Sequence, residues 1–404
     1  MAPSQPSSRG LGAVLAAQFM SALADNALLF AAIALLKSRS APDWYTPLLQ
    51  EFFLLAYILL APFVGHVADA FPKGRAMLVA NTLKFTGALA MLAGANPLLA
   101  YGLVGVGAAA YSPAKYGILS ELVTKDKLVK ANGLLEGSTI AAILIGVVLG
   151  GYLADQGARL AVGFTVVTYL LAALANLRIP ALAPASPGGL RSPVALMGEF
   201  KRAVATLLSH PDGRFTLLGT SVFWGTGSTL RFLLIAWVPV ALGLSSGSTA
   251  ANLNGVVAVG IAMGAAAAAR FVSLVNVNRA LPAGLALGVL IMLFAQVTNL
   301  YVAAGMLVLI GICGGFYVVP LNALLQEKGH ATVGAGSAIA VQNFLENLLM
   351  LVFLGAYTVM VRAGLPTVGI AMTFGAVVLV AIGGLAWGRV RGARPTTGQP
   401  ELHS

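Results

Sequence analysis

Charged residues are scarce in this chain of 404 residues. They make up 9% of it, and hydrophobic residues make up 58%, whereas an ordinary soluble domain carries about 25% charged residues. So few charges cannot coat the surface of a soluble protein of this size, and a chain this apolar is not expected to be disordered. The composition therefore predicts an integral membrane protein.

Cysteine and histidine are also rare. The single Cys313 lies in an apolar run, which excludes a disulfide framework and a metal site built from several cysteines. The four histidines are scattered, and the sequence has no P-loop, no G-x-S-x-G elbow and no H-E-x-x-H motif. We therefore expect no metal, no cofactor and no enzymatic activity.

Acidic residues are fewer than basic ones, 13 against 24, so the net charge is +11. In membrane proteins, Lys and Arg collect in cytoplasmic loops. If both termini are cytoplasmic, eighteen of the 24 basic residues lie on that side, and only Lys37, Arg39, Arg159 and Arg362 lie on the other. The positive charge then reflects membrane topology, and no nucleic-acid partner is expected.

Apolar runs long enough to span a bilayer core, which takes roughly 20 residues, recur twelve times. They begin near Leu11, Leu48, Ala76, Leu98, Asn132, Leu160, Phe215, Ala250, Leu281, Leu300, Gly336 and Thr367. We predict an all-α integral membrane protein with 12 transmembrane helices.

A polar linker divides the spans into two groups of six. We predict a six-helix bundle over residues 1–179, a cytoplasmic linker over 180–214, a second bundle over 215–388 and a polar cytoplasmic tail over 389–404. Ser192 and Pro193 suit the start of an amphipathic helix in the linker. That helix would either lie on the membrane surface or pack between the bundles.

The two groups resemble each other in sequence. An offset of 206 residues aligns 105–121 with 311–327 and matches Gly105 with Gly311, Tyr111 with Tyr317, and Glu121 with Glu327. The same offset superposes the first span on the seventh. Parallel six-helix repeats are the organisation of major facilitator transporters, whose substrates bind near the midplane between the halves. We therefore expect two pseudo-symmetric bundles.

Four charged residues fall deep within the spans: Asp25, Lys84, Arg231 and Glu346. A charge at a helix centre costs about 2.5–3.5 kcal/mol on insertion scales, so it usually faces a partner or a watered cavity. The 206-residue offset makes Asp25 and Arg231 equivalent, so the two are expected to meet across a central cavity. Their pair would be either a switch that substrate breaks or a structural tie between the halves.

The other deep polar residues allow two interpretations each. Asn343 and Glu346 share one helix face, which indicates either a cavity wall or interhelical hydrogen bonding. Lys84 is expected to be a packing or snorkelling residue. Lys115 beside Tyr116 either binds a phosphate or caps a helix end on the cytoplasmic side.

Glycines four residues apart recur at Gly133/Gly137, Gly146/Gly150, Gly260/Gly264 and Gly311/Gly315. Small residues at this spacing let helices pack closely. We interpret these pairs as packing surfaces and not as a binding motif.

The sequence resembles known families at two levels, through one short loop motif and through several longer strings. GHVADAFPKGR, residues 65–75, resembles the loop motif of the major facilitator superfamily, although Gly74 is displaced and Ala70 replaces a basic residue. This resemblance implies a gating loop that uses Asp69 and Arg75. Longer strings, among them SALADNALLFAAIALLK, LVGVGAAAYSPAKYGILSEL and GSAIAVQNFLEN, resemble the bacterial lysophospholipid transporters along nearly the whole chain.

The second resemblance implies a flippase that moves lysophosphatidylethanolamine-like lipids from the outer to the inner leaflet of the bacterial inner membrane by alternating access. It also implies a separate acyltransferase/acyl-carrier-protein synthetase partner that re-acylates them. The family's embedded polar positions match Asp25, Asn26, Lys115, Arg231 and Glu346. The alternatives are efflux of another amphiphile and a non-transporting membrane subunit of a lipid acyltransferase.

Overall fold

The structure is a computed structural model that describes residues 8–123, 125–180, 182, 192–244, 246–333 and 335–392. Within these ranges the regular structure is entirely helical. Most of the predicted linker before residue 192, and residues 393–404 of the predicted tail, lie outside the described part of the chain.

The helices form two halves joined by one linker helix. The N-terminal half contains α1 (Ser8–Ser38), α2 (Tyr45–Ala70), α3 (Lys73–Leu92), α4 (Pro97–Gly117), the short α5 (Leu119–Leu122), α6 (Lys125–Gln156) and α7 (Ala158–Asn176). The linker helix is α8 (Pro193–Ser209). The C-terminal half contains α9 (Pro211–Leu242), α10 (Gly247–Phe271), the 3-10 helix η1 (Leu274–Ala280), α11 (Leu281–Phe294), α12 (Leu300–Thr332), α13 (Ala335–Arg362) and α14 (Thr367–Gly392).

Length and composition explain why these segments are membrane helices. Ten described helices are long and apolar enough to cross a membrane, and α3 and α4 add spans of 20 and 21 residues. Polar residues mark the starts of two helices: the side chains of Asn96 and Asn299 accept hydrogen bonds from the first turns of α4 and α12. The prediction of a twelve-helix, two-bundle membrane protein is confirmed.

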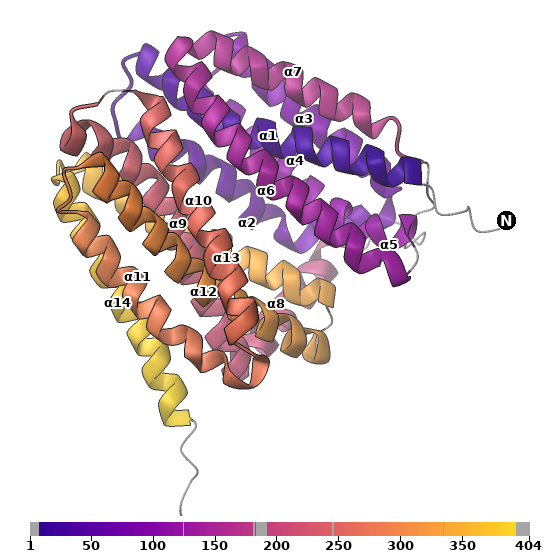
Figure 1. Ribbon diagram of the computed structural model, residues 1–404. Helices are drawn as coiled ribbons and strands as arrows, with labels where there is room; N and C mark the ends of the chain where they lie inside the picture. The colour runs from indigo at the N-terminus through magenta and orange to yellow at the C-terminus, as the bar shows by residue number, and fades with distance from the viewer. Residues whose placement is uncertain are drawn as a thin grey trace, which may run out of the picture.

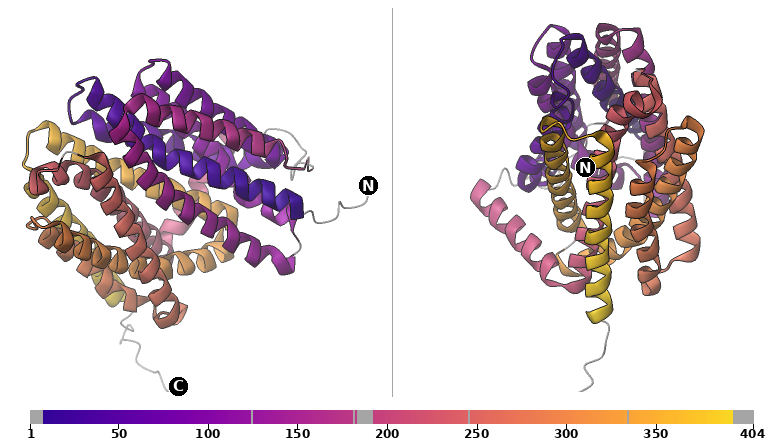
Figure 2. Two further views of the ribbon diagram at one scale, coloured as in Figure 1. Left: turned by 45° about the horizontal axis from the view of Figure 1, so that its top comes forward. Right: turned by 90° about the vertical axis from the view of Figure 1, so that its left-hand side faces the viewer.

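The two halves lie side by side and meet at one end (Figures 1 and 2). We call the end where α1 begins and α14 finishes the terminal end. The opposite end, where α1, α6, α9 and α13 finish, is the far end. Contacts between the halves run chiefly along two helix pairs, α2 with α13 and α6 with α10.

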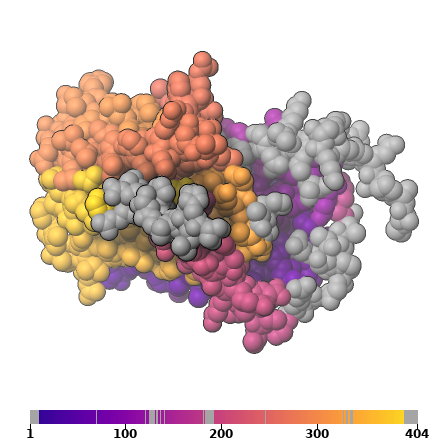
Figure 3. Space-filling model, turned by 90° about the horizontal axis from the view of Figure 1, so that it is seen from below, coloured from indigo at the N-terminus to yellow at the C-terminus, as the bar shows by residue number. Residues whose placement is uncertain are grey.

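The linker helix α8 lies at the terminal end, where it contacts α2, α9 and α13. Leu196 and Leu207 are buried, and Lys201 and Arg202 on the opposite face are exposed. Seen from below, α8 lies along one margin of the molecule beside both halves (Figure 3). The amphipathic pattern thus packs against the bundles while it keeps a basic face outward.

Glycines allow the closest contact within the C-terminal half. A Cβ atom on Gly260 or Gly264 of α10 would overlap backbone atoms of α12, and one on Gly311 or Gly315 of α12 would overlap backbone atoms of α10. The absence of side chains at all four positions lets the two backbones touch. The packing interpretation is confirmed for these two glycine pairs.

Gly311→Val tests this contact. We expect it to lower the thermal stability of the purified protein, because an added side chain in a well-packed contact typically costs about 1–3 kcal/mol. Gly305→Val on the same helix is the control, because a Cβ there meets nothing within 4 Å. Equal melting temperatures for the two variants in detergent would contradict the assignment.

Candidate functional site

A cavity of about 770 Å³ opens between the halves toward the terminal end. Its walls come from α2, α4, α8 and α13, and much of its lining is apolar or small. The polar side chains that line it are Tyr57, His66, Ser112, Tyr116, Glu199, Ser337, Asn343 and Asn347. Of the predicted site residues, Tyr116 and Asn343 line this cavity.

Asp25 lies at the centre of a hydrogen-bonded network inside the N-terminal half. One carboxylate oxygen accepts a bond from Lys84 Nζ at 2.7 Å, and the other accepts one from the Tyr169 hydroxyl at 2.7 Å. Lys84 also donates to the Ser21 hydroxyl at 2.9 Å, and Ser21 donates to Asn81 at 2.8 Å. The network thus joins α1, α3 and α7.

Of the two expectations for Lys84, the structure contradicts snorkelling and agrees with helix packing, because the side chain is 1% exposed and bonds to α1. A charge in an apolar bundle is tolerated when it is paired, and α3 brings this long side chain within reach of α1. The sequence carried a signal for this pairing: Ser21 and Asp25 are four residues apart on α1, and Asn81 and Lys84 are three apart on α3. Each pair presents two polar groups on one helix face.

Arg231 does not form the expected pair with Asp25 in this conformation. Within the described residues no ion pair joins Arg231 to an acidic side chain. Tyr101 on α4 lies within electrostatic range of both Arg231 and Asp25. The two charges therefore flank the same part of the bundle without touching.

Glu346 is 7% exposed and is held by the Gln342 amide, and no ion pair of Glu346 is found among the described residues. Gln342 Nε2 donates to Glu346 Oε1 at 2.8 Å and to Asn322 Oδ1 at 2.8 Å, and Thr220 of α9 faces the same carboxylate. Asn343, one turn earlier, lines the cavity. The two interpretations of this face are thus both present: Asn343 is a wall residue, and Gln342, which holds Glu346, makes the interhelical hydrogen bond to Asn322 of α12.

The remaining predicted residues lie nearer the surface of the site. Asn26 donates to the Ala22 carbonyl of its own helix at 2.9 Å. Lys115 Nζ lies 4.7 Å from the centre of the Tyr116 ring, a cation–π distance, at the mouth of the cavity where Tyr116 is 42% exposed.

The predicted gating loop is described only in part, and its role stays a prediction. Arg75 is exposed, and the side chain of Asp69 lies outside the described part of the chain. The loop residue with a clear role is Lys73, which is 4% exposed and pairs with Glu121 at 2.5 Å. The ammonium therefore ties the start of α3 to α5 at the terminal end.

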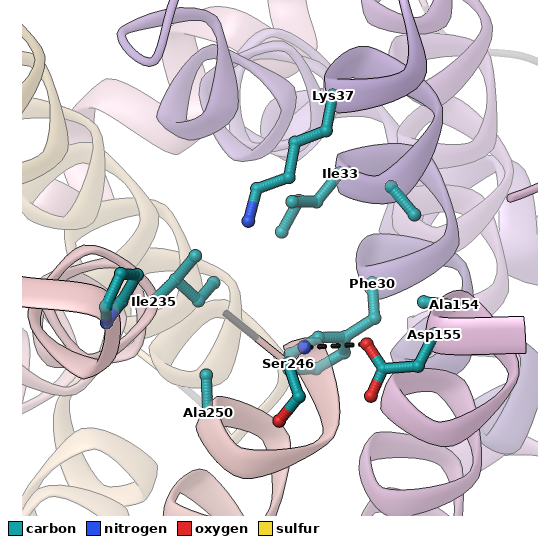
Figure 4. A pocket seen from close by; sticks show the side chains of 11 residues that line it. Phe30, Ile33, Lys37, Ala154, Asp155, Ile235, Ser246 and Ala250 are labelled. Atoms are coloured by element: carbon teal, nitrogen blue, oxygen red, sulfur yellow. Dashed lines mark hydrogen bonds between the residues drawn. The ribbon is translucent and has the colours of Figure 1, made fainter. Parts of the chain in front are cut away.

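The far end is closed by contacts between α6 and α10. Asp155 accepts a hydrogen bond from the backbone N–H group of Gly247 at 2.7 Å (Figure 4). It accepts a second one from the backbone N–H group of Ser248 at 2.9 Å. A carboxylate at a helix N-terminus is favoured by the unpaired N–H groups and the helix dipole. Lys37 extends into the same small pocket, of about 270 Å³ (Figure 4).

An apolar contact lies directly below this hydrogen-bonded cap. Phe30, Val147 and Ala251 form a buried cluster that joins the halves, and a Cβ on Gly151 would overlap Ala251. Glycine at position 151 is therefore what lets α6 and α10 meet.

A second closure joins α2 to α13 at the far end. The Thr358 hydroxyl donates to Glu51 at 2.5 Å, and the Arg362 guanidinium lies 5.1 Å from the Trp44 ring centre. The bundle is thus sealed at the far end on both sides while its cavity opens at the terminal end. Sequence reasoning missed these closing residues, because no local pattern marks a contact between distant helices.

Two six-helix halves, a cavity between them and closure at one end define a transporter of the major facilitator superfamily. The family model described as Major Facilitator Superfamily matches residues 14–354. A solved structure of a bacterial homologue of the human lysosomal transporter Spinster, inward-facing and unoccupied, superposes with a TM-score of 0.68 at 15% identity and covers 96% of each chain. This likeness supports the fold.

Curated relatives are much closer in sequence. The chain is 56% identical over 385 residues to the "Lysophospholipid transporter LplT" of Enterobacter sp. (strain 638), covering 95% of this chain and 97% of the relative. It is 54% identical over 375 residues to the protein of that name from Escherichia coli O7:K1, covering 93% and 94%. The chain therefore belongs to the LplT family of the major facilitator superfamily.

Gly151→Leu tests the far-end closure. The added side chain should hold α6 and α10 apart and raise thiol labelling of Ala250→Cys, in a Cys313→Ser background, by about tenfold, because an overlap of 1–3 kcal/mol shifts a two-state equilibrium by that order. Gly137→Leu on the same helix is the control, because a Cβ there meets nothing within 4 Å. Unchanged labelling in Gly151→Leu would contradict the closure.

Proposed function

We propose that this protein is a lysophospholipid transporter that moves its substrate across the bilayer by alternating access and is not an enzyme. Family membership supports the substrate class. The observation that carries the mechanism is the cavity, which is open at the terminal end between α2, α4 and α13, whereas Asp155 and Gly151 seal the far end.

The charges suit a lysolipid headgroup. Such a lipid carries a phosphate, and in the ethanolamine form an ammonium, on a single acyl chain. Arg231, the deep cation that lacks an ion-pair partner within the described residues, supplies a guanidinium for the phosphate. Lys115 and Tyr116 offer a second phosphate contact at the cavity mouth, and the apolar wall accepts the acyl chain.

The acidic and amide groups complete the proposed site. Asn343, which lines the cavity, and Glu346, further along α13, would contact an ammonium or the glycerol hydroxyl, and Asp25 and Asn26 on α1 would contribute from the N-terminal half. Asp25 acts there as part of its pair with Lys84. The headgroup would therefore pass the neutral Asp25–Lys84 pair of the N-terminal half and, one after the other, the separated charges of the C-terminal half.

Orientation follows from the basic residues. Most Lys and Arg lie in loops of the terminal end, so we place that end in the cytoplasm of a cell with a bacterial inner membrane. Closure at the far end then corresponds to an inward-facing state. Transport would run from the outer to the inner leaflet, where a separate acyltransferase/acyl-carrier-protein synthetase would re-acylate the product.

Lysolipid transfer in proteoliposomes tests the function. We expect the purified protein to accelerate leaflet transfer of lysophosphatidylethanolamine over empty liposomes. Transfer of an unrelated amphiphile without the lysolipid would instead favour efflux. Co-purification with an acyltransferase but no transfer of any lipid would favour a non-transporting subunit.

Arg231→Gln tests the phosphate contact. Because hydrogen bonds to charged groups contribute about 1.5–3 kcal/mol, we expect a loss of about tenfold or more in uptake, with partial recovery in Arg231→Lys. Arg159→Gln, at an exposed position on α7, is the control and should transport normally. Wild-type uptake by Arg231→Gln in correctly inserted protein would overturn the role of Arg231.

A further inference from the structure

Lys84 does more than pack, because its ammonium neutralises the charge of the Asp25 carboxylate. Its ammonium is 2.7 Å from Asp25 and 2.9 Å from Ser21. It also lies 5.0 Å from the ring centre of Tyr111 and 5.9 Å from that of Tyr169, within cation–π range. These four contacts hold the ammonium in one place.

Asp25, in contrast, keeps an accessible face. Its side chain is 24% exposed, against 2% for Lys84. Tyr57, which lines the large cavity, lies within electrostatic range of Asp25. The partner that faces open space is therefore the carboxylate, and the partner that neutralises it lies behind, in the protein.

We propose that Lys84 is a positioning residue that sets headgroup charge preference. Lys84 neutralises Asp25 from the side away from open space. An anionic lysolipid can therefore pass the carboxylate without being repelled. The attraction of the carboxylate for the ammonium of a zwitterionic lysolipid is reduced for the same reason. This inference rests on the proposed transport function. It concerns the ratio between two substrates, whereas the proposed function concerns transport itself.

Coulomb's law gives the direction of each change. Without Lys84, Asp25 carries an unbalanced negative charge, which attracts an ammonium and repels a net anion. Without Asp25, Lys84 carries an unbalanced positive charge, and the preference moves the other way. A purely structural network predicts a different outcome: either substitution would impair both substrates to the same degree.

The test compares lysophosphatidylethanolamine, which is zwitterionic, with lysophosphatidylglycerol, which is anionic, in competition for the purified full-length transporter in proteoliposomes. For Lys84→Met we expect the uptake ratio to move toward the zwitterion by about tenfold, the factor that 1.4 kcal/mol produces. For Asp25→Asn the ratio should move toward the anion. The double variant, with neither charge, should return to within about twofold of the wild-type ratio.

Two further variants separate charge from folding. Lys84→Arg keeps the charge and should keep the wild-type ratio even where its rate falls. Lys73→Met removes another buried, ion-paired lysine, at the terminal end, and should leave the ratio unchanged. Where a variant turns over too slowly, equilibrium competition binding gives the same ratio.

Equal loss of both lipids in Lys84→Met and in Asp25→Asn, with an unchanged ratio, would overturn the proposal and leave Lys84 a structural residue. A shift of both single variants in the same direction would also overturn it. Failure of the wild-type protein to move either lipid would instead overturn the proposed function.

Discussion

The buried ion pair between Asp25 and Lys84 sets how the N-terminal half behaves. Both partners belong to the same half, and Tyr169 on α7 completes the coordination of the carboxylate. Leaving one member of such a buried pair unpartnered typically costs 3–5 kcal/mol. Any motion that separated α1 from α3 or α7 would break this network. The half is therefore expected to move as one body, and opening of the transporter must occur elsewhere.

The contacts between the halves have the opposite character. At the far end the cap on α10 is a single exposed carboxylate with two backbone hydrogen bonds, and below it one small apolar cluster joins α6 to α10. Within the C-terminal half, by comparison, α10 and α12 touch backbone to backbone over two pairs of glycines. Contacts within each half are thus stronger than contacts between the halves. This difference suits rocking of two rigid bodies, the motion that alternating access requires.

Sequence reasoning recovered the fold because each signal was either local or repeated. Apolar length located the helices, and the 206-residue offset revealed the duplication. It also found Asp25, Arg231 and Glu346, because charges in apolar runs stand out. It paired Asp25 with the wrong cation, since an internal repeat equates depth along two helices and carries no information about lateral distance. The contact of Asp155 with Gly247 could not be predicted from the sequence for a related reason, because it depends on the angle between the two halves.

The two halves differ in the charges at their centres, and this difference constrains how a substrate can pass. The N-terminal half is neutral at its centre, whereas the C-terminal half holds Arg231 on α9 and Glu346 on α13. Glu346 is level with Thr220 of α9, eleven residues before Arg231, which at 1.5 Å per residue is about 16 Å along the bundle. One headgroup cannot contact both at that separation. On the proposed route from the far end to the terminal end, a lysolipid would meet Arg231 before Glu346, so its phosphate would be held before its ammonium or hydroxyl reached α13.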